Sequence, residues 1–243
     1  MSLASRSRFF APILAALLAA APAAFSATVV PRVEVETFSR DAAPSAKAAK
    51  ATFQTPFAGG RLISEGFDGF ATWDGAAAAR GSTDLGGTAV GSFRAYGTAG
   101  SGRSKVGDGR KLQVRADSDM AWGRYDTDLP VDGHWLDSND NTGIEWTISG
   151  LGRFDALSFF VLDAADVGGW FSMTIGDTVF DIAGQSGRTA NGNILFVKVL
   201  LDTLVDTLTV RLGHDRANDG FGLDGATVAR LPATSAAETT RRR

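Results

Sequence analysis

The stretch from Trp170 to Ile182 reads WFSMTIGDTVFDI, and it decides the fold class. Apolar and polar residues alternate in two runs on either side of the dipeptide Gly176-Asp177. Such alternation is typical of a β-strand with one buried face, and Gly-Asp suits a tight turn that needs positive φ. The stretch therefore predicts two antiparallel strands joined as a β-hairpin.

The same kind of pattern continues on both sides of this hairpin, over residues 61–231. Short apolar runs are separated by clusters of Gly, Asp, Asn and Ser, and no long run has the period of a helix. Further strands are expected at 62–67, 88–96, 111–116, 121–125, 144–148, 156–163, 194–200, 207–212 and 222–229. So many short strands predict an all-β domain, a two-sheet antiparallel β-sandwich that is jelly-roll-like.

The N-terminal segment has the layout of a secretory signal peptide. Arg6 and Arg8 precede an apolar run at 9–18, and small residues up to Ser26 offer a cleavage site. The alternative is an N-terminal membrane anchor, but the apolar run is shorter than the ~20 residues that span a bilayer. We therefore expect removal of residues 1–26 and a mature protein that is secreted, extracellular or periplasmic, with no membrane span.

Residues 27–60 lie between the signal peptide and the predicted sandwich. Val and Glu alternate within 28–38, which predicts a strand edge or an extended arm. The run 41–55 is rich in Ala and Lys, and a short helix and a flexible linker remain as alternatives for it. At the other end, residues 232–243 are expected to form a disordered tail, so the β-sandwich domain is assigned to 61–231.

Composition excludes several classes of function. The 243 residues contain no Cys, which excludes disulfides, thiolate metal sites and a Cys nucleophile, and the 2 His leave little room for a His-rich metal centre. The formal net charge of -3 argues against nucleic acid as a partner. Apolar residues make up 44% of the chain, which is enough for a folded core. The sequence leaves the oligomeric state open.

Two motifs at the ends of the predicted domain carry a resemblance to a known family. The segment Ser64-Glu-Gly-Phe-Asp-Gly-Phe70 resembles the opening strand of secreted bacterial jelly-roll proteins of the PEP-CTERM/VPLPA-CTERM type. The segment Asn218-Asp-Gly-Phe-Gly-Leu-Asp-Gly-Ala-Thr-Val228 resembles their closing strand, which also occurs in carbohydrate-binding modules and MAM-like domains. Sorted members carry an apolar span before a terminal Arg cluster. Here a short polar segment precedes the Arg residues 241–243, so the resemblance implies a released protein.

The resemblance also implies a structural Ca²⁺ site that joins the first and last strands. The matching ligands are Glu65, Asp68, Asp219 and Asp224, and Gly225 stands where many relatives carry a second Asp. Carboxylate oxygens suit Ca²⁺, and no soft ligand competes in a chain without Cys. The alternative is that these acids only cap turns at the strand ends.

A second Asx-rich segment, 137–143, has oxygen ligands at alternate positions, as a calcium loop does. Thr142 replaces the turn Gly, and Ile148 stands where a bidentate Glu is needed, so an EF-hand is excluded. An Asx-rich turn that caps itself and an irregular Ca²⁺ or Na⁺ site remain as alternatives.

One region combines aromatic and charged residues in the way a binding site does. Trp122, Arg124, Tyr125 and Trp135 are the candidate ligand-binding residues, because sugar rings stack on flat aromatic faces beside hydrogen-bonding groups. The alternative is that a sandwich of this size buries its Trp side chains. An extracellular polysaccharide or matrix is the expected partner.

No catalytic residue is assigned. The β pattern offers no unit for a Ser nucleophile elbow, and His134 and His214 are expected on loops or at the surface. We expect a secreted, non-catalytic β-sandwich that binds extracellular glycan or matrix or serves a structural role outside the cell. The alternative is a polysaccharide-acting hydrolase or lyase. Glycosidase chemistry needs two carboxylates in one cleft.

Overall fold

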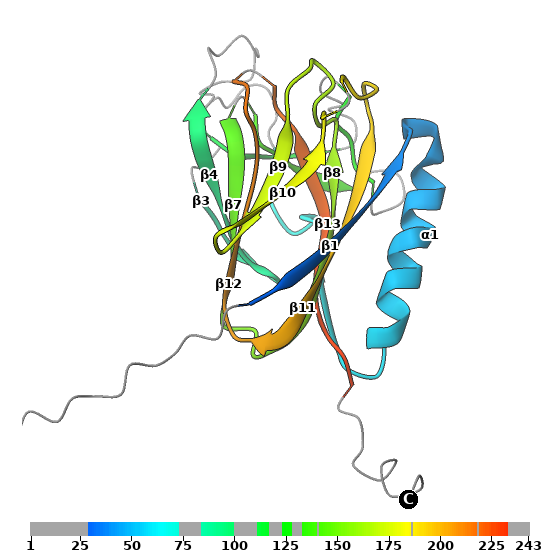
Figure 1. Ribbon diagram of the computed structural model, residues 1–243, viewed down its shortest axis with the longest axis vertical. Helices are drawn as coiled ribbons and strands as arrows, with labels where there is room; N and C mark the ends of the chain where they lie inside the picture. The colour runs from blue at the N-terminus through cyan, green and yellow to red at the C-terminus, as the bar shows by residue number, and fades with distance from the viewer. Residues whose placement is uncertain are drawn as a thin grey trace, which may run out of the picture.

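The computed structural model describes residues 29–72, 84–99, 111–116, 123–127, 133–139, 141–185, 187–217 and 219–232. Two antiparallel β-sheets pack face to face in this part of the chain (Figure 1). The all-β sandwich expected from the alternation is therefore confirmed. The predicted signal peptide, at 1–26, and residues 233–243 of the predicted tail lie outside the described residues.

One sheet, which we name the covered sheet, contains seven strands. They are β1 (Pro31–Phe38), β2 (Arg61–Glu65), β5 (Gln113–Ala116), β6 (His134–Asp137), β8 (Phe154–Leu162), β11 (Ile194–Val205) and β13 (Gly222–Arg230). Their order is β1–β11–β8–β13–β6–β5, and β2 pairs antiparallel with β13. This pairing places the opening and closing motifs side by side.

The other sheet, which we name the open sheet, contains six strands. They are β3 (Asp84–Thr88), β4 (Gly91–Ala99), β7 (Asn141–Ile148), β9 (Phe171–Ile175), β10 (Thr178–Ala183) and β12 (Leu208–His214). Their order is β10–β9–β12–β7–β4–β3, and β9 and β10 form the hairpin that the sequence predicts. Between β7 and β13 every connection except this hairpin crosses to the other sheet, as in a jelly-roll-like sandwich.

The core lies between the two sheets and is built from the alternate side chains of each strand. In β9 the apolar positions are buried, whereas Ser172 and Thr174 are half-buried on the outer face. Trp146 of β7 stacks on Phe93 of β4 with ring centroids 5.5 Å apart. Its Nε1 donates to the carbonyl oxygen of Val90 at 3.0 Å, which satisfies the polar atom of a fully buried ring.

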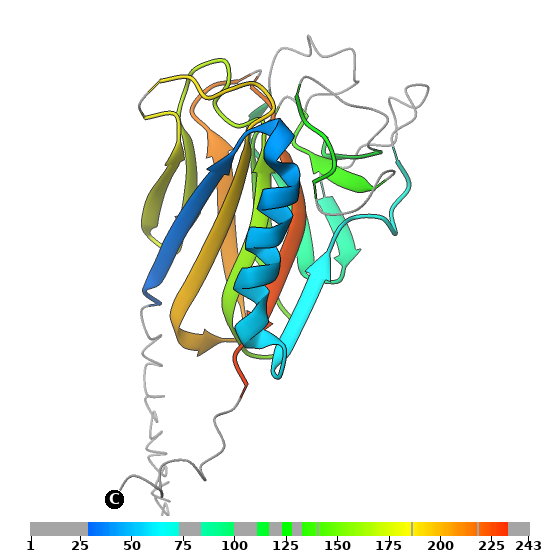
Figure 2. The same cartoon turned by 90° about the vertical axis from the view of Figure 1, so that its right-hand side faces the viewer.

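A helix covers the outer face of the covered sheet (Figure 2). It is α1 (Ala43–Gln54), with the short 3-10 helices η1 (Arg40–Ala42) before it and η2 (Thr55–Phe57) after it. Phe53 of α1 meets Phe196 of β11 edge to face, with ring centroids 6.1 Å apart. The outer face of this sheet is therefore a second apolar interface.

The segment before residue 61 belongs to the folded unit. All eight residues of β1 pair in register with β11, so the strand edge expected at 28–38 is present. The short helix is the alternative that occurs within 41–55. Because β1 and α1 both pack on the covered sheet, the folded unit extends about thirty residues beyond the boundary that composition indicated.

Three strands differ from the sequence expectation. β3 and β6 form where none was expected. No strand forms over 123–125, the described part of the strand expected at 121–125, and residues 121 and 122 lie outside the described residues. Gly123 has φ of 96°, a conformation that ends regular strand geometry. Arg124 and Tyr125 are both buried, so neighbouring side chains do not alternate between core and solvent there.

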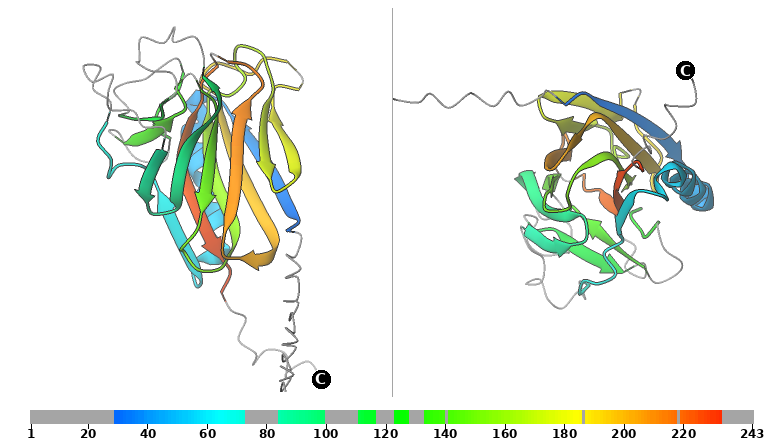
Figure 3. Two further views of the ribbon diagram at one scale, coloured as in Figure 1. Left: turned by 90° about the vertical axis from the view of Figure 1, so that its left-hand side faces the viewer. Right: turned by 90° about the horizontal axis from the view of Figure 1, so that it is seen from below.

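The two outer faces differ in what lies on them. The left view of Figure 3 shows the open sheet facing the viewer with α1 behind the sandwich. Among the described elements, none packs on the outer face of the open sheet, and the exposed side chains of Tyr96, Trp170 and Val179 lie there. No helix in the described ranges is long and apolar enough to cross a membrane.

Candidate functional site

Cross-strand neighbours on the outer face of the open sheet form two parallel rows. One row contains Thr174, Arg211, Glu145 and Arg94, which lie opposite one another on β9, β12, β7 and β4. The next row contains Asp181, Ser172, Gly213, Gly143 and Tyr96 in the same strand direction. The register of five strands therefore brings together residues that are far apart in the sequence.

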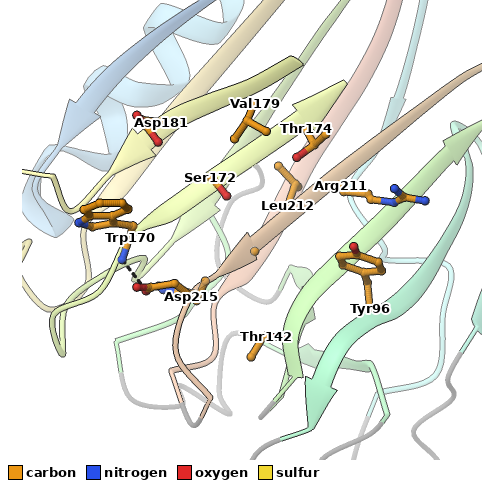
Figure 4. Close-up of a pocket in the computed structure, with 12 residues that line it drawn as sticks. Tyr96, Thr142, Trp170, Ser172, Thr174, Val179, Asp181, Arg211, Leu212 and Asp215 are labelled. Carbon is orange, nitrogen blue, oxygen red and sulfur yellow. Dashed lines mark hydrogen bonds between the residues drawn. The ribbon is translucent and has the colours of Figure 1, made fainter. Parts of the chain in front are cut away.

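A hollow lies along the second row, and Gly213 is one of the residues that line it. Gly213 and Gly143 lie opposite each other on β12 and β7, so neither strand has a side chain at this position. A Cβ at Gly213 would lie 2.6 Å from the carbonyl oxygen of Thr142, so this close approach of backbones requires glycine. The hollow has a volume of about 440 Å³. Figure 4 shows Trp170 and Tyr96 on opposite sides of it.

Trp170 stands at one side of the hollow with 59% of its surface exposed. Its backbone N–H donates to the Oδ1 atom of Asp215 at 2.7 Å, and the N–H of Asp215 donates back to its carbonyl oxygen at 3.1 Å. This reciprocal pair ties the start of β9 to the end of β12. The indole ring is therefore carried on a backbone that two hydrogen bonds hold in place.

Tyr96 stands at the other side, on β4, with 42% of its surface exposed. The Cζ atom of Arg211 lies 5.1 Å from the centroid of its ring, within the range of a cation–π contact. Thr142, Ser172, Thr174 and Asp181 add hydrogen-bonding groups to the lining. An exposed ring on each side and polar groups between them form a face that can stack and hydrogen-bond a ligand.

A second, smaller hollow of about 310 Å³ adjoins the first and shares Thr174 and Arg211 with it. Arg94 and Arg211 both bind the carboxylate of Glu145, at 2.5 Å and 2.8 Å. The carboxylate raises the pKa of Arg211, through a hydrogen bond and by charge. The two hollows form one groove that runs across the strands.

The structure places the sequence-predicted binding residues elsewhere. Trp135 is 0% exposed, and Arg124 and Tyr125 are buried, so these three side chains have no open face. Trp122 lies outside the described residues. The hydroxyl of Tyr125 donates to the carbonyl oxygen of Gly192 at 3.1 Å. The three described residues thus pack the covered sheet and its loops, as the alternative of buried Trp side chains expects.

Arg124 belongs to a buried ionic group. The carboxylate of Asp137 accepts a hydrogen bond from Nε of Arg115 at 2.9 Å and another from Nη1 of Arg124 at 2.8 Å. All three side chains are almost fully buried. Asp137 also accepts the backbone N–H of Asn139 at 2.9 Å, and the side-chain amide of Asn141 donates to the carbonyl oxygen of Ser138 at 2.9 Å. In the described part of segment 137–143 these contacts form the self-capping Asx-rich turn.

The side chains of the four predicted Ca²⁺ ligands each contact different groups of the protein. Glu65 accepts the N–H groups of Phe67 and Ala89, at 2.7 Å and 2.8 Å, and Asp68 accepts that of His134 at 3.1 Å. The described ranges contain no group of three or more His, Cys, Asp or Glu placed to hold a metal ion. The structure therefore does not gather the four acids at one point, and Ca²⁺ binding stays a prediction.

The two remaining acids lie deeper. Asp224 is fully buried and accepts the N–H groups of Thr127 and Gly225, at 2.8 Å and 2.6 Å. Asp219 is 4% exposed, with its Oδ2 atom 3.3 Å from Nδ1 of His214. Burial, and then the neighbouring Asp166 carboxyl, raise the pKa of Asp219 to about 7.

His214 is not on the surface, where the sequence placed it. It ends β12 and its ring packs against Phe171 and Phe221, at centroid distances of 5.0 Å and 5.8 Å. Burial lowers its pKa to about 4. His134 is half-buried, and its Nδ1 atom lies 3.3 Å from the carbonyl oxygen of Phe67.

The groove residues carried a weak signal in the sequence. Strand alternation marks Ser172 and Thr174 as outward-facing, and the same rule applies to Arg94 and Tyr96. The sequence did not predict how these strands pair, because most strands that pair in this sheet are not consecutive along the chain. No protein-family model matches the chain and no curated protein matches it significantly, so the chemistry of the groove rests on its own residues.

Proposed function

We propose that the protein is a secreted, non-catalytic β-sandwich that binds an extracellular polysaccharide in the groove of its open sheet. One observation carries the proposal. Trp170 and Tyr96, both exposed, flank a hollow that Gly213 lines without a side chain. The layout of residues 1–26 supports export.

The groove suits sugar rings for two physical reasons. An exposed aromatic face offers the apolar faces of a sugar a stacking surface, and it loses little conformational freedom on binding. The hydroxyls of Thr142, Ser172 and Thr174 both donate and accept hydrogen bonds, as sugar hydroxyls do. Three strand-to-strand steps separate β4 from β9, which corresponds to about 14 Å and leaves room for more than one ring.

A structural role of one carboxylate in the groove supports a non-catalytic function. Asp181 and Asp215 both line the larger hollow, and Oδ1 of Asp215 accepts the N–H of Trp170. Glycosidase chemistry typically needs a pair of carboxyl groups in which one acts as a general acid. Asp215 instead serves to hold the ring that faces the ligand.

The test begins with a glycan array on the mature protein and continues with affinity electrophoresis on the glycans that bind. Trp170→Ala and Tyr96→Ala are expected to weaken binding about tenfold or more, since an aromatic contact contributes on the order of 1–2 kcal/mol. Both rings are exposed, so the melting temperature should change little. Leu62→Ala, at an exposed position on β2 of the covered sheet, is the control and should bind like the wild type.

Three results would overturn the proposal. The wild type could bind no glycan, or the two aromatic variants could bind as well as the Leu62→Ala control. Release of reducing sugar by the wild type would move the protein to the enzyme class.

A further inference from the structure

The smaller hollow differs in chemistry from the larger one. Among the described residues no aromatic side chain lines it, and its charged lining residues are Arg94, Arg211 and Glu145. Two guanidinium groups and one carboxylate leave an excess of one positive charge. The hydroxyls of Thr174 and Thr209 complete the polar lining.

Both arginines keep unused hydrogen-bond donors. Arg94 donates to Glu145 from Nη2, and Arg211 donates to it from Nε. A guanidinium carries five N–H groups, so most donors of each side chain make no hydrogen bond within the described residues. The side chains of Arg94 and Arg211 are 56% and 47% exposed, which leaves these donors accessible to a ligand.

Arg211 connects the two hollows. It lines both of them and its guanidinium stands over the ring of Tyr96. A ligand that stacks on Tyr96 therefore comes close to this charge. Asp84 lies opposite Arg94 on the edge strand β3, but it is not among the residues that line the smaller hollow.

The charges along the groove also determine which hollow an anionic group of the ligand would occupy. Asp181 and Asp215 line the groove with Trp170, and both arginines lie in the other row. An anionic group is repelled by the two aspartates and attracted by the two arginines. It therefore belongs in the smaller hollow while the sugar rings occupy the larger one.

We propose that the smaller hollow selects an acidic polysaccharide by binding a carboxylate or sulfate group of the chain through Arg94 and Arg211. This inference rests on the proposed glycan binding. Uronate carboxylates and sulfate esters both spread a negative charge over two or more terminal oxygens, two of which a guanidinium group can bind in a bidentate manner. Thr174 and Thr209 can donate to the same oxygens.

The measurement is a ratio of affinities for an acidic polymer and its neutral counterpart. Polygalacturonate with its methyl ester tests the carboxylate, and dextran sulfate with dextran tests the sulfate. The ratio is expected to exceed one for at least one pair and to fall as NaCl rises, because exposed charges are screened by salt. Arg94→Gln and Arg211→Gln should each lower the ratio about three- to tenfold.

Glu145→Gln is expected to change the ratio of affinities in the opposite direction. It removes the carboxylate that offsets the two arginines, so the ratio should rise. If the three residues served only to hold the sheet together, this variant would weaken binding to both polymers equally. Arg32→Gln, an exposed arginine on β1 of the covered sheet, is the matched control and should leave the ratio unchanged.

The outcomes separate this inference from the proposed function. Binding to neutral glycans alone, or a ratio near one in the wild type, overturns the acidic selectivity and leaves glycan binding intact. An unchanged ratio in both arginine variants also overturns it. The absence of any glycan binding overturns both.

Discussion

The substitution Asp219→Asn is expected to stabilise the protein at pH 8 and to leave its stability nearly unchanged at pH 4. Asp219 is almost fully buried, and its Oδ2 atom accepts no hydrogen bond from the described residues. Burial and the Asp166 carboxyl raise its pKa from 3.8 to about 7. An Asn side chain is uncharged and can donate to Asp166, as the protonated carboxyl does.

The sign follows from proton linkage. Between about pH 4 and pH 7 the native state binds a proton at Asp219 that the unfolded chain has released, so stability falls as pH rises through this window. A shift of about three pKa units corresponds to about 4 kcal/mol, and water near this loop screens part of it. The Asn variant cannot ionise and so avoids this loss of stability. At pH 8 its free energy of unfolding should exceed that of the wild type by roughly 2–4 kcal/mol.

The assay is urea denaturation of both proteins from pH 4 to pH 8. The difference between the two proteins is the informative quantity, because His214 has the opposite effect. Its pKa is lowered from 6.5 to about 4, so its contribution to stability rises with pH across that interval. Asp177→Asn, in the exposed turn of the β9–β10 hairpin, is the control and should show no such pH dependence. A variant that is less stable at every pH, or whose difference from wild type does not change with pH, would refute this reasoning.

Three further predictions concern other parts of the chain. Asp137→Asn leaves Arg115 and Arg124 buried without their carboxylate, and urea denaturation should give a loss of about 3–5 kcal/mol; a loss within experimental error would contradict the structural role of the ionic group. N-terminal sequencing of the exported protein should begin near residue 24 or 27, and an intact initiator Met on that form would exclude cleavage. Added Ca²⁺ should raise the melting temperature and a chelator should lower it, because an ion bound to the native state stabilises it by mass action; an unchanged transition in both cases would rule out the Ca²⁺ site.

Local patterns in the sequence were sufficient for the elements that form between neighbouring segments. The hairpin around Gly176-Asp177 is an example, since both the alternation and the turn that joins its strands lie within one short stretch. The strand β6 is a counter-example. Its residues Trp135 and Leu136 are adjacent and both fully buried, because other parts of the chain cover both faces of that strand. Alternation predicts one exposed face and fails where both are covered.

The candidate site shows the same limit. Exposed aromatic residues in a sequence cannot be told from buried ones by their type, since a ring has similar apolar surface in either place. From the sequence, Trp135 was predicted as a binding residue and Trp170 only as part of the hairpin, whereas packing encloses Trp135 and leaves Trp170 59% exposed. The buried pair formed by Asp137 and Arg124 was equally unreadable, because charged residues are normally placed at the surface.

The sequence by itself determined the β class of the fold, the hairpin at 170–182 and the opening and closing strands, which tertiary structure then pairs as β2 and β13. The hairpin follows from the period of two along a strand, which is a local property of the chain, and the β class follows from the repeated short apolar runs between turn residues. Only the tertiary structure decided where the groove lies. The register of β4, β7, β12 and β9 places Tyr96, Gly143, Gly213 and Ser172 in one row, although more than seventy residues separate the first from the last. Strand order depends on contacts between distant segments, and no local pattern encodes it.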